Sequence, residues 1–116
     1  MQLGTAAAIE VAGYEGNAYG MNNAGGIGTI AANVATGLPI SSTNAAVNVY
    51  NGQMILNLLD AADNTWSSGG NYSRQDNSAH ASVGTKSLAG PITRVRVTTV
   101  GGVDLLDAGK VSVSCQ

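Results

Sequence analysis

The stretch TRVRVTTV, residues 93–100, decides the fold class, because its side chains alternate between two environments. Val95 and Val97 share one side of an extended chain, whereas Arg94 and Arg96 share the other. One apolar side and one polar side are typical of a strand in an antiparallel sheet that buries a single face. The stretch therefore predicts an all-β protein.

The same two-residue period recurs along the chain, with turn residues every 8–12 positions. No stretch of ten or more residues keeps its apolar side chains on one helical face without an interrupting Gly or Asn. The pattern predicts eight short strands: Thr5–Ala12, Ile27–Val34, Ala45–Tyr50, Met54–Leu59, Trp66–Ser73, His80–Leu88, Ile92–Val100 and Ala108–Cys115.

Turn residues predict the breaks between these strands. Asn51-Gly52 is a strong hairpin signal, because both residues tolerate a positive φ. The run Asp60–Asn64 predicts a turn in which short polar side chains bond the nearby backbone. Gly69-Gly70, Gly90-Pro91 and Gly101-Gly102 predict the remaining breaks. Pro91 lacks an N–H group, so it should precede the seventh strand or lie on an edge.

Eight such strands fit a single-domain antiparallel β-sandwich over residues 1–116, with a jelly-roll arrangement as the commonest form. The immunoglobulin-like sandwich is the rival, but the chain lacks its Cys…Trp…Cys spacing. Residues 1–46 are rich in Gly, Ala and Asn, contain no Lys or Arg and are weakly patterned; residues 47–116 are well patterned. Met54–Leu59 is almost continuously apolar, which predicts a central strand or one that contacts a partner chain.

Composition excludes several functional classes. The 116 residues carry a net charge of −2 with only five Lys and Arg, which gives no electrostatic footprint for nucleic acid. No apolar run is long enough to span a membrane, and the first residues lack the pattern of a secretory signal. Cys115 is the single cysteine, so neither an internal disulfide nor a zinc site is expected. With no Phe and 17 Ala, the core should be thin.

The sequence offers no convincing reactive centre, so we expect no catalytic residue, no cofactor and no metal. His80 is the only histidine, and its Ser/Ala-rich context predicts a solvated residue at a strand start. The pairs Asp60/Asp63 and Asp104/Asp107 lie in turn-like contexts, where capping of backbone N–H groups is favoured over a calcium site or acid–base work. The segment GGIGTIAA matches a dinucleotide fingerprint only formally, because no helix follows it.

Four residues remain as candidates for an interface. Trp66 and Tyr72 are six residues apart, which places them on one face of a strand. They are expected to fill the core, with a sugar-stacking platform or a subunit contact as alternatives. Arg94 and Arg96 would make polar contacts across an interface or simply form a solvated strand face.

Two segments, NGQMILNLLDAADNTWSSGGNYS (51–73) and GTKSLAGPITRVRVTTVGGVDLLDAGKVSV (84–113), carry a resemblance. They resemble a family of small virion structural proteins of tailed phages that infect marine bacteria. The resemblance rests on the LxLxDAAxNTW stretch, the GxKxL segment and the RVRxTTVxGxDxxDAGxVxV ending, a little over half of the chain. Two positions depart from the family: Leu106 stands where an aromatic residue is expected, and Cys115 is unlike the usual ending.

The resemblance implies a non-enzymatic virion component. The leading expectation is a capsid decoration (cement or knob) protein on the capsid surface, a homotrimer bound to the major capsid protein. The alternative is a receptor- or glycan-binding module of a tail or fibre, and a third is a β-sandwich with an unrelated partner. Because residues 1–46 carry no cation, they are the expected contact with the capsid or sister subunits, and deletion of residues 1–20 should abolish attachment.

Overall fold

The structure is a computed structural model that describes residues 1–22, 24, 26–31, 33–41, 47–99 and 108–114. Within these residues every regular element is a strand and every strand pair is antiparallel. The all-β prediction is therefore confirmed. The strands are β1 (Gln2–Gly4), β2 (Tyr14–Met21), β3 (Ile27–Ala31), β4 (Tyr50–Asp60), β5 (Thr65–Arg74), β6 (Ala79–Ser87) and β7 (Arg94–Arg96).

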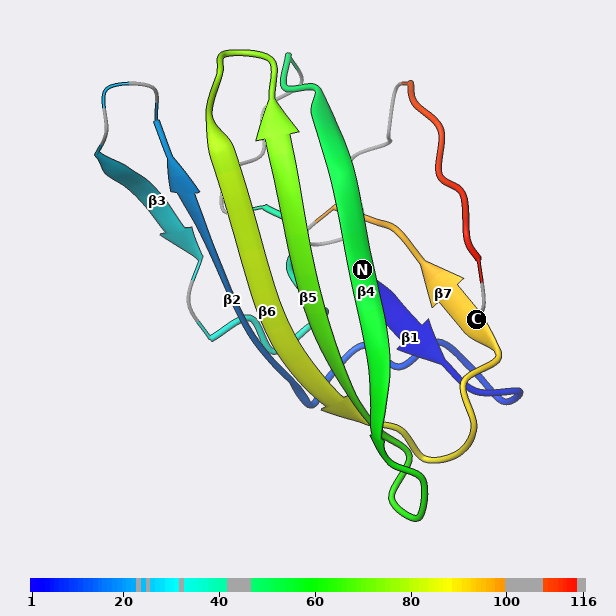
Figure 1. Cartoon of the computed structure of the whole chain (residues 1–116). Helices are drawn as coiled ribbons and strands as arrows, with labels where there is room; N and C mark the ends of the chain where they lie inside the picture. The colour runs from blue at the N-terminus through cyan, green and yellow to red at the C-terminus, as the bar shows by residue number, and fades with distance from the viewer. Residues whose placement is uncertain (23, 25, 32, 42–46, 100–107, 115–116) are drawn as a thin grey trace.

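The strands form two sheets. Five of them form one sheet in the order β3-β2-β6-β5-β4, and β1 pairs with β7 in a second, two-stranded sheet. Figure 1 shows the larger sheet in front, with β1, β7 and the connection after β3 behind it. The larger sheet therefore has one covered face, here called the inner face, and one open face, here called the outer face.

Small residues line part of the inner face of the larger sheet. Gly16, Gly84 and Ser68 form one row across β2, β6 and β5. Leu38 and Pro39 pack onto this row so closely that a Cβ atom on Gly16 would lie 2.6 Å from Pro39 Cδ. A Cβ atom on Gly84 would lie 2.8 Å from Leu38 Cδ2. The glycines therefore let the segment that covers the sheet approach its backbone directly.

The core lies at the Tyr14 end of the larger sheet. Leu3, Tyr14, Leu38 and Leu88 form a buried cluster against which Trp66 and other apolar side chains pack. The Tyr14 hydroxyl lies 2.7 Å from the Leu3 amide nitrogen, which donates to it, and donates in turn to the Glu10 carbonyl at 2.8 Å. This hydroxyl therefore satisfies one backbone group of the three-residue strand β1 and one of the segment before β2. The core is small, as the composition predicts.

Several predicted elements are confirmed. The predicted strands Ile27–Val34, Met54–Leu59, Trp66–Ser73 and His80–Leu88 each overlap one of β3 to β6 over most of its length. The predicted turn at Asp60–Asn64 is also present. Asp60 Oδ1 accepts from the Ala62 amide at 2.7 Å, and Asn64 has a φ of 50°. The capping role assigned to Asp60 therefore holds, whereas Asp104 and Asp107 lie outside the described residues.

The prediction for the first strand was wrong. Thr5–Ala12 contains a turn closed by a bond from the Thr5 amide to the Ala8 carbonyl and only an isolated bridge at Ile9. The long strand near the N-terminus is instead β2, which the sequence analysis missed. Its inward positions are Tyr, Gly, Ala and Gly, so the usual run of large inward apolar residues is absent.

Two glycine pairs predicted as breaks lie inside strands. Asn51-Gly52 is in β4 and Gly69-Gly70 is in β5, and both pair regularly with the neighbouring strand. Gly52 and Gly70 lie against the Tyr72 side chain, where a Cβ atom on Gly70 would lie 2.5 Å from its hydroxyl. These two glycines serve close packing rather than chain reversal. The predicted break at Gly90-Pro91 does precede β7, and Gly101-Gly102 lies outside the described residues.

The remaining strand predictions need correction or fall outside the described part. Of the described residues 92–99 in the predicted strand Ile92–Val100, only Arg94–Arg96 forms a strand, and Val95 is 39% exposed rather than buried. Ala108–Cys115 contains no strand within its described residues, 108–114. Of Ala45–Tyr50, only Tyr50 is in a strand, and residues 45–46 are not described. The eight-stranded jelly-roll arrangement is therefore not confirmed.

Candidate interaction face

The outer face of the larger sheet is the most distinctive surface of the described chain. Side chains alternate along each strand, so the register places every second residue of β2, β6, β5 and β4 on this face. The charged residues among them are Glu15 and Asp60, which the shifted register at the end of β4 places opposite Thr65. The large apolar members are about half exposed: Tyr19 47%, Met21 46%, Ile55 52% and Val83 58%.

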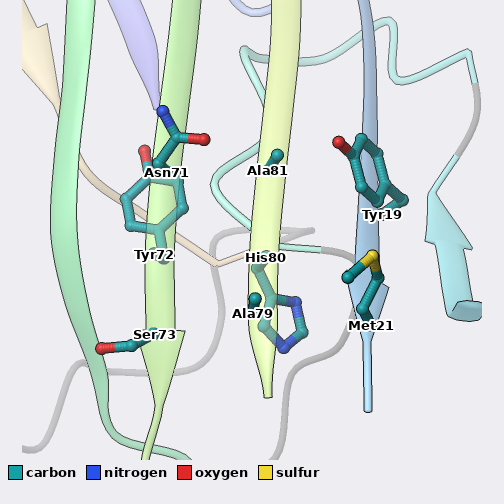
Figure 2. Close-up of a pocket in the computed structure, with 8 residues that line it drawn as sticks. All are labelled: Tyr19, Met21, Asn71, Tyr72, Ser73, Ala79, His80 and Ala81. Atoms are coloured by element: carbon teal, nitrogen blue, oxygen red, sulfur yellow. The ribbon is translucent and has the colours of Figure 1, made fainter. Parts of the chain in front are cut away.

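The outer face is hollowed over β6. One hollow of about 400 Å³ has Tyr19 and Met21 of β2 on one side and Asn71 and Ser73 of β5 on the other. Figure 2 shows these side chains around the short residues of β6 between them. A second hollow of about 610 Å³ lies towards the Glu15 end of the same strands and includes Val83 in its lining. Small side chains on β6 between larger ones on β2 and β5 explain this relief.

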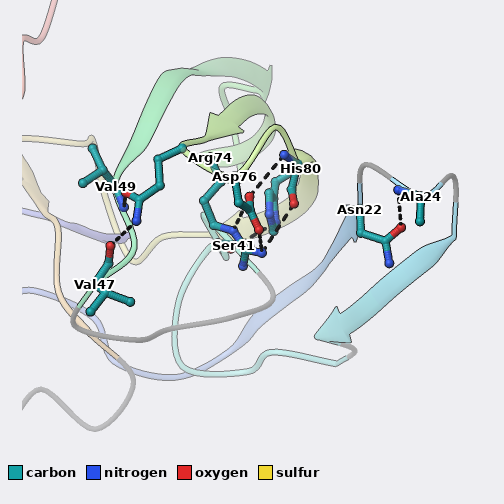
Figure 3. A network of polar contacts seen from close by, with 10 residues as sticks. Asn22, Ala24, Ser41, Val47, Val49, Arg74, Asp76 and His80 are labelled. Atoms are coloured by element: carbon teal, nitrogen blue, oxygen red, sulfur yellow. Dashed lines mark hydrogen bonds and ion pairs between the residues drawn. The ribbon is translucent and has the colours of Figure 1, made fainter.

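A polar cluster lies on the inner side, at the end of the sheet away from the core (Figure 3). His80 Nδ1 is 3.3 Å from the Ser41 hydroxyl oxygen, and the Tyr50 ring meets the His80 ring edge-on at 5.2 Å. The Asp76 carboxylate is bound by the Arg74 guanidinium and by the Ser78 amide nitrogen at 3.2 Å. The cluster therefore ties the turn after β5 and residue 41 to the sheet.

The cluster differs from a nucleophile–base–acid triad in its geometry. In such a triad one imidazole nitrogen faces the nucleophile and the other faces an orienting carboxylate. Here His80 Nδ1 faces Ser41, while the buried His80 Nε2 has no hydrogen-bond partner, and Asp76 is engaged by Arg74. No group of three His, Cys, Asp or Glu side chains suited to a metal ion occurs in the part of the chain that the structure describes.

The prediction that His80 is solvated was wrong. The residue is only 5% exposed, because its ring packs over Gly20 on the neighbouring strand and against Tyr50. A Cβ atom on Gly20 would lie 2.6 Å from the His80 ring. Burial lowers the pKa of His80, and the nearby Arg74 charge acts in the same direction. The imidazole is thus held preferentially in its neutral form.

Trp66 and Tyr72 share one face of β5, as their spacing predicts, but that face is the inner one. Trp66 packs against the core cluster, and its Nε1 atom is buried. The Tyr72 hydroxyl is also buried, beside the Ser82 hydroxyl above Gly70, and burial raises its pKa. This placement agrees with core filling and does not give an open platform for stacking sugars.

Arg94 and Arg96 are both exposed on β7, and each bonds within the chain. The Arg94 guanidinium donates to the Ala6 carbonyl at 2.8 Å. Arg96 Nε donates to the Gln2 side-chain oxygen at 2.8 Å, so both arginines tie β7 to the segment around β1. The structure does not bring them together with Trp66 and Tyr72 into one site.

The residues that define the outer face were not singled out from the sequence. The signal was present in YEGNAYGM, residues 14–21, where Tyr19 and Met21 alternate with Gly and Ala. A strand whose small residues face inwards turns its larger residues towards solvent. This inversion of the usual pattern is what a search for inward apolar side chains overlooks.

Comparisons with known proteins identify no relative of this chain. No protein-family model matches the chain, no curated protein matches it, and no solved structure matches it. Within the described residues, no helix is long and apolar enough to cross a membrane.

Proposed function

We propose that the protein is a non-enzymatic structural component of a bacteriophage virion, which decorates and stabilises the outside of the capsid as a homotrimer bound to the major capsid protein. The observation that supports this proposal is the outer face. Exposed apolar residues that gather on one regular surface are typical of interaction sites rather than of free monomer surface. A sheet face that carries only two charged residues, Glu15 and Asp60, suits a largely neutral protein surface as its partner.

The small core supports the same proposal. Only five hydrophobic residues are counted as buried among the described residues, whereas Tyr19, Met21, Ile55 and Val83 are half exposed. Association with neighbours stabilises such a chain, because a partner that binds only the folded state shifts the folding equilibrium. We also propose that the two sheets form the two layers of a β-sandwich. The jelly-roll arrangement stays a prediction.

The structure changes the experiment that tests attachment. Deletion of residues 1–20 would remove β1, most of β2 and the buried Leu3 and Tyr14, so the deleted chain would lose its core. The sharper variant is Val83→Lys, which places a charge in the middle of the outer face. Val11→Lys is the matched control, because Val11 is 54% exposed and lies outside the larger sheet.

Mass spectrometry of purified particles, with copy number, tests the location. Hundreds of copies per particle support capsid decoration, whereas a few to tens indicate a tail or fibre part, and none contradicts a virion role. Rebinding to stripped particles then tests the face. Val83→Lys should lose attachment and Val11→Lys should keep it; equal attachment of both would contradict docking through the outer face.

A second candidate function, a glycan-binding module of a tail or fibre, is favoured by the hollow next to Tyr19. An exposed aromatic ring with Asn71 and Ser73 opposite offers a stacking surface and neutral hydrogen-bonding groups. Tyr19→Ala should then abolish glycan-array binding, while Trp66→Ala tests only core packing. A decoration protein would show no glycan binding that depends on Tyr19.

A further inference from the structure

Strand β4 is an unusually unprotected sheet edge. It has eleven residues, Tyr50–Asp60, and contains no proline and a single charge, Asp60, at its last position. Edge strands normally carry lysines, prolines or bulges, or are short, because an open edge pairs readily with another chain. The register of β4 against β5 is irregular only between Leu58 and Asp60. Most of the strand is therefore a straight, uncharged edge.

The other edge of the same sheet differs in these respects. Strand β3 has five residues, and its pairing with β2 is irregular between Tyr19 and Met21. On β4, by contrast, Ile55 is 52% exposed and Leu58 is 48% exposed. In an antiparallel sheet every second residue of an edge strand directs its N–H and C=O groups away from its neighbour. No described strand pairs with that side of β4.

The described chain also contains a strand-like segment without a sheet. Residues 108–114 form no strand, and all seven are exposed. Within them Val111 and Val113, which alternate with serines, are 66% and 73% exposed. Alternating β-branched residues favour a strand that buries one side. Lys110 is the only charge in this segment, as Asp60 is the only charge in β4.

We propose that residues 110–114 of one copy of this chain add as a sixth strand to the free edge of β4 in a second copy. The backbone groups of β4 provide the hydrogen bonds of this β-augmentation, and alternate valines provide the apolar contacts. The opposite charges of Lys110 and Asp60 favour the encounter, and no like charge on either segment opposes it.

A second copy, rather than the same copy, is the occupant for two reasons. Within one copy the segment is exposed along its whole described length, and its backbone runs apart from β4 in Figure 1. The small core also leaves stability to be gained from association. Donation of a segment from one copy to a different surface of the next is a heterologous contact, which closes into a ring when the rotation permits. The inference names the interface of the proposed homo-oligomer and does not depend on a virion location.

The first experiment compares oligomeric state by analytical ultracentrifugation of the full chain. The double variant V111D/V113D and the edge variant Ile55→Lys should each reduce the mass from that of the oligomer to that of one chain. Val11→Lys is the matched control, because Val11 is 54% exposed and lies outside the larger sheet, and it should remain oligomeric. Urea unfolding checks that each variant is folded.

The second experiment stays decisive if a variant fails to fold. Two chains are mixed, both in a Cys115→Ser background. The isotope-labelled chain carries one cysteine in β4, in place of Gln53, Ile55 or Asn57. The unlabelled chain carries one cysteine in residues 110–114, in place of Ser112 or Val113, and every combination is tested. Oxidation should give covalent pairs that contain one labelled and one unlabelled chain.

Three outcomes overturn the proposal. In a further variant that carries both cysteines on one chain, disulfides within that chain would show that the segment pairs with its own β4. Covalent pairs of two labelled chains would show that two β4 edges pair with each other. A wild-type chain that sediments as a monomer, together with cysteine variants that form no covalent pairs, would show that the edge stays open. If the wild-type chain forms the oligomer but does not bind phage particles, the virion proposal fails and this inference stands.

Discussion

The Lys86 ammonium nitrogen lies 2.6 Å from a Glu10 carboxylate oxygen, although the Lys86 side chain is only 7% exposed. The same nitrogen lies 5.3 Å from the centre of the Tyr14 ring. Glu10 also accepts a hydrogen bond from the Ala89 amide at 2.9 Å. Glu10 therefore joins the segment before β2 to β6 through Lys86 and to the chain just after β6 through Ala89.

Removal of one partner of this pair should destabilise the fold. In Glu10→Gln the buried ammonium of Lys86 keeps its charge and loses its counterion, which costs about 3 kcal/mol of unfolding free energy. Replacement of both partners, in E10Q/K86M, should cost less than Glu10→Gln alone, because no unpaired charge remains. Urea denaturation of the single and double variants measures this difference. Equal losses in both would show that the charge of Lys86 is solvated.

The pair should also make stability depend on pH in the acid range. The hydrogen bond from Lys86, followed by that from the Ala89 amide, lowers the pKa of Glu10 from its ordinary value of 4.5. The unfolded chain therefore binds a proton before the folded chain does, so the stabilisation is complete above pH 4.5 and is lost as the pH falls through the lower, folded pKa. Thermal unfolding at several pH values should show a smaller loss in Glu10→Gln. Identical profiles would contradict the assignment to Glu10.

His80 should add a second pH dependence closer to neutrality. Because burial lowers its pKa below 6.5, the unfolded chain takes up this proton first as the pH falls. Stability should therefore decrease from about pH 6.5 down to the folded pKa and be unaffected by this group above that range. Titration of the imidazole by proton NMR gives the folded pKa directly, and a folded pKa above 6.5 would refute the assignment. Asn48→His, at a half-buried site outside the strands, serves as a control histidine.

The glycines of the larger sheet should not be equivalent. Gly84→Ala places a Cβ atom 2.8 Å from Leu38 Cδ2 and 2.9 Å from the Glu15 carbonyl oxygen, so the cover must shift at a cost of about 1–3 kcal/mol. Gly69→Ala on β5 is the matched control, because nothing lies within 4 Å of its Cβ position. There alanine should stabilise the strand by about 0.5–1 kcal/mol. Equal effects in chemical denaturation would mean that Leu38 does not pack on the sheet as described.

These glycines also explain how far the sequence alone predicts this fold. Local patterns predict β5, β6 and the turn at Asp60. The turn, for example, depends on a hydrogen bond between Asp60 and the amide two residues later. Strand β2 does not, because its inward glycines have meaning only beside the Leu38-Pro39 segment, which is distant in sequence. Gly70 was interpreted as a break for the same reason: its partner, Tyr72, lies above it only once the sheet has formed.

The candidate face was harder to predict than the strands. Tyr19 is recognised as a surface residue only when the opposite face of its strand is known to be covered. The burial of His80 likewise depends on Gly20 in a strand that the periodicity did not predict. Sequence patterning thus located most of the hairpins, whereas the pairing of β2 with β6 decided which side of each became a surface.

The Tyr14 hydroxyl provides a last test, of the link between β1 and the larger sheet. Tyr14→Phe keeps the buried ring but removes the acceptor of the Leu3 amide and the donor to the Glu10 carbonyl. A buried amide left without a partner costs about 1–3 kcal/mol, so the free energy of unfolding should fall by that amount. Tyr19→Phe is the matched control, because that side chain is 47% exposed on the outer face, and its loss should be within about 0.5 kcal/mol. Hydrogen exchange of the Leu3 amide should accelerate in Tyr14→Phe alone. Unchanged exchange there would show that the short strand β1 is held by its pairing with β7 and not by the tyrosine.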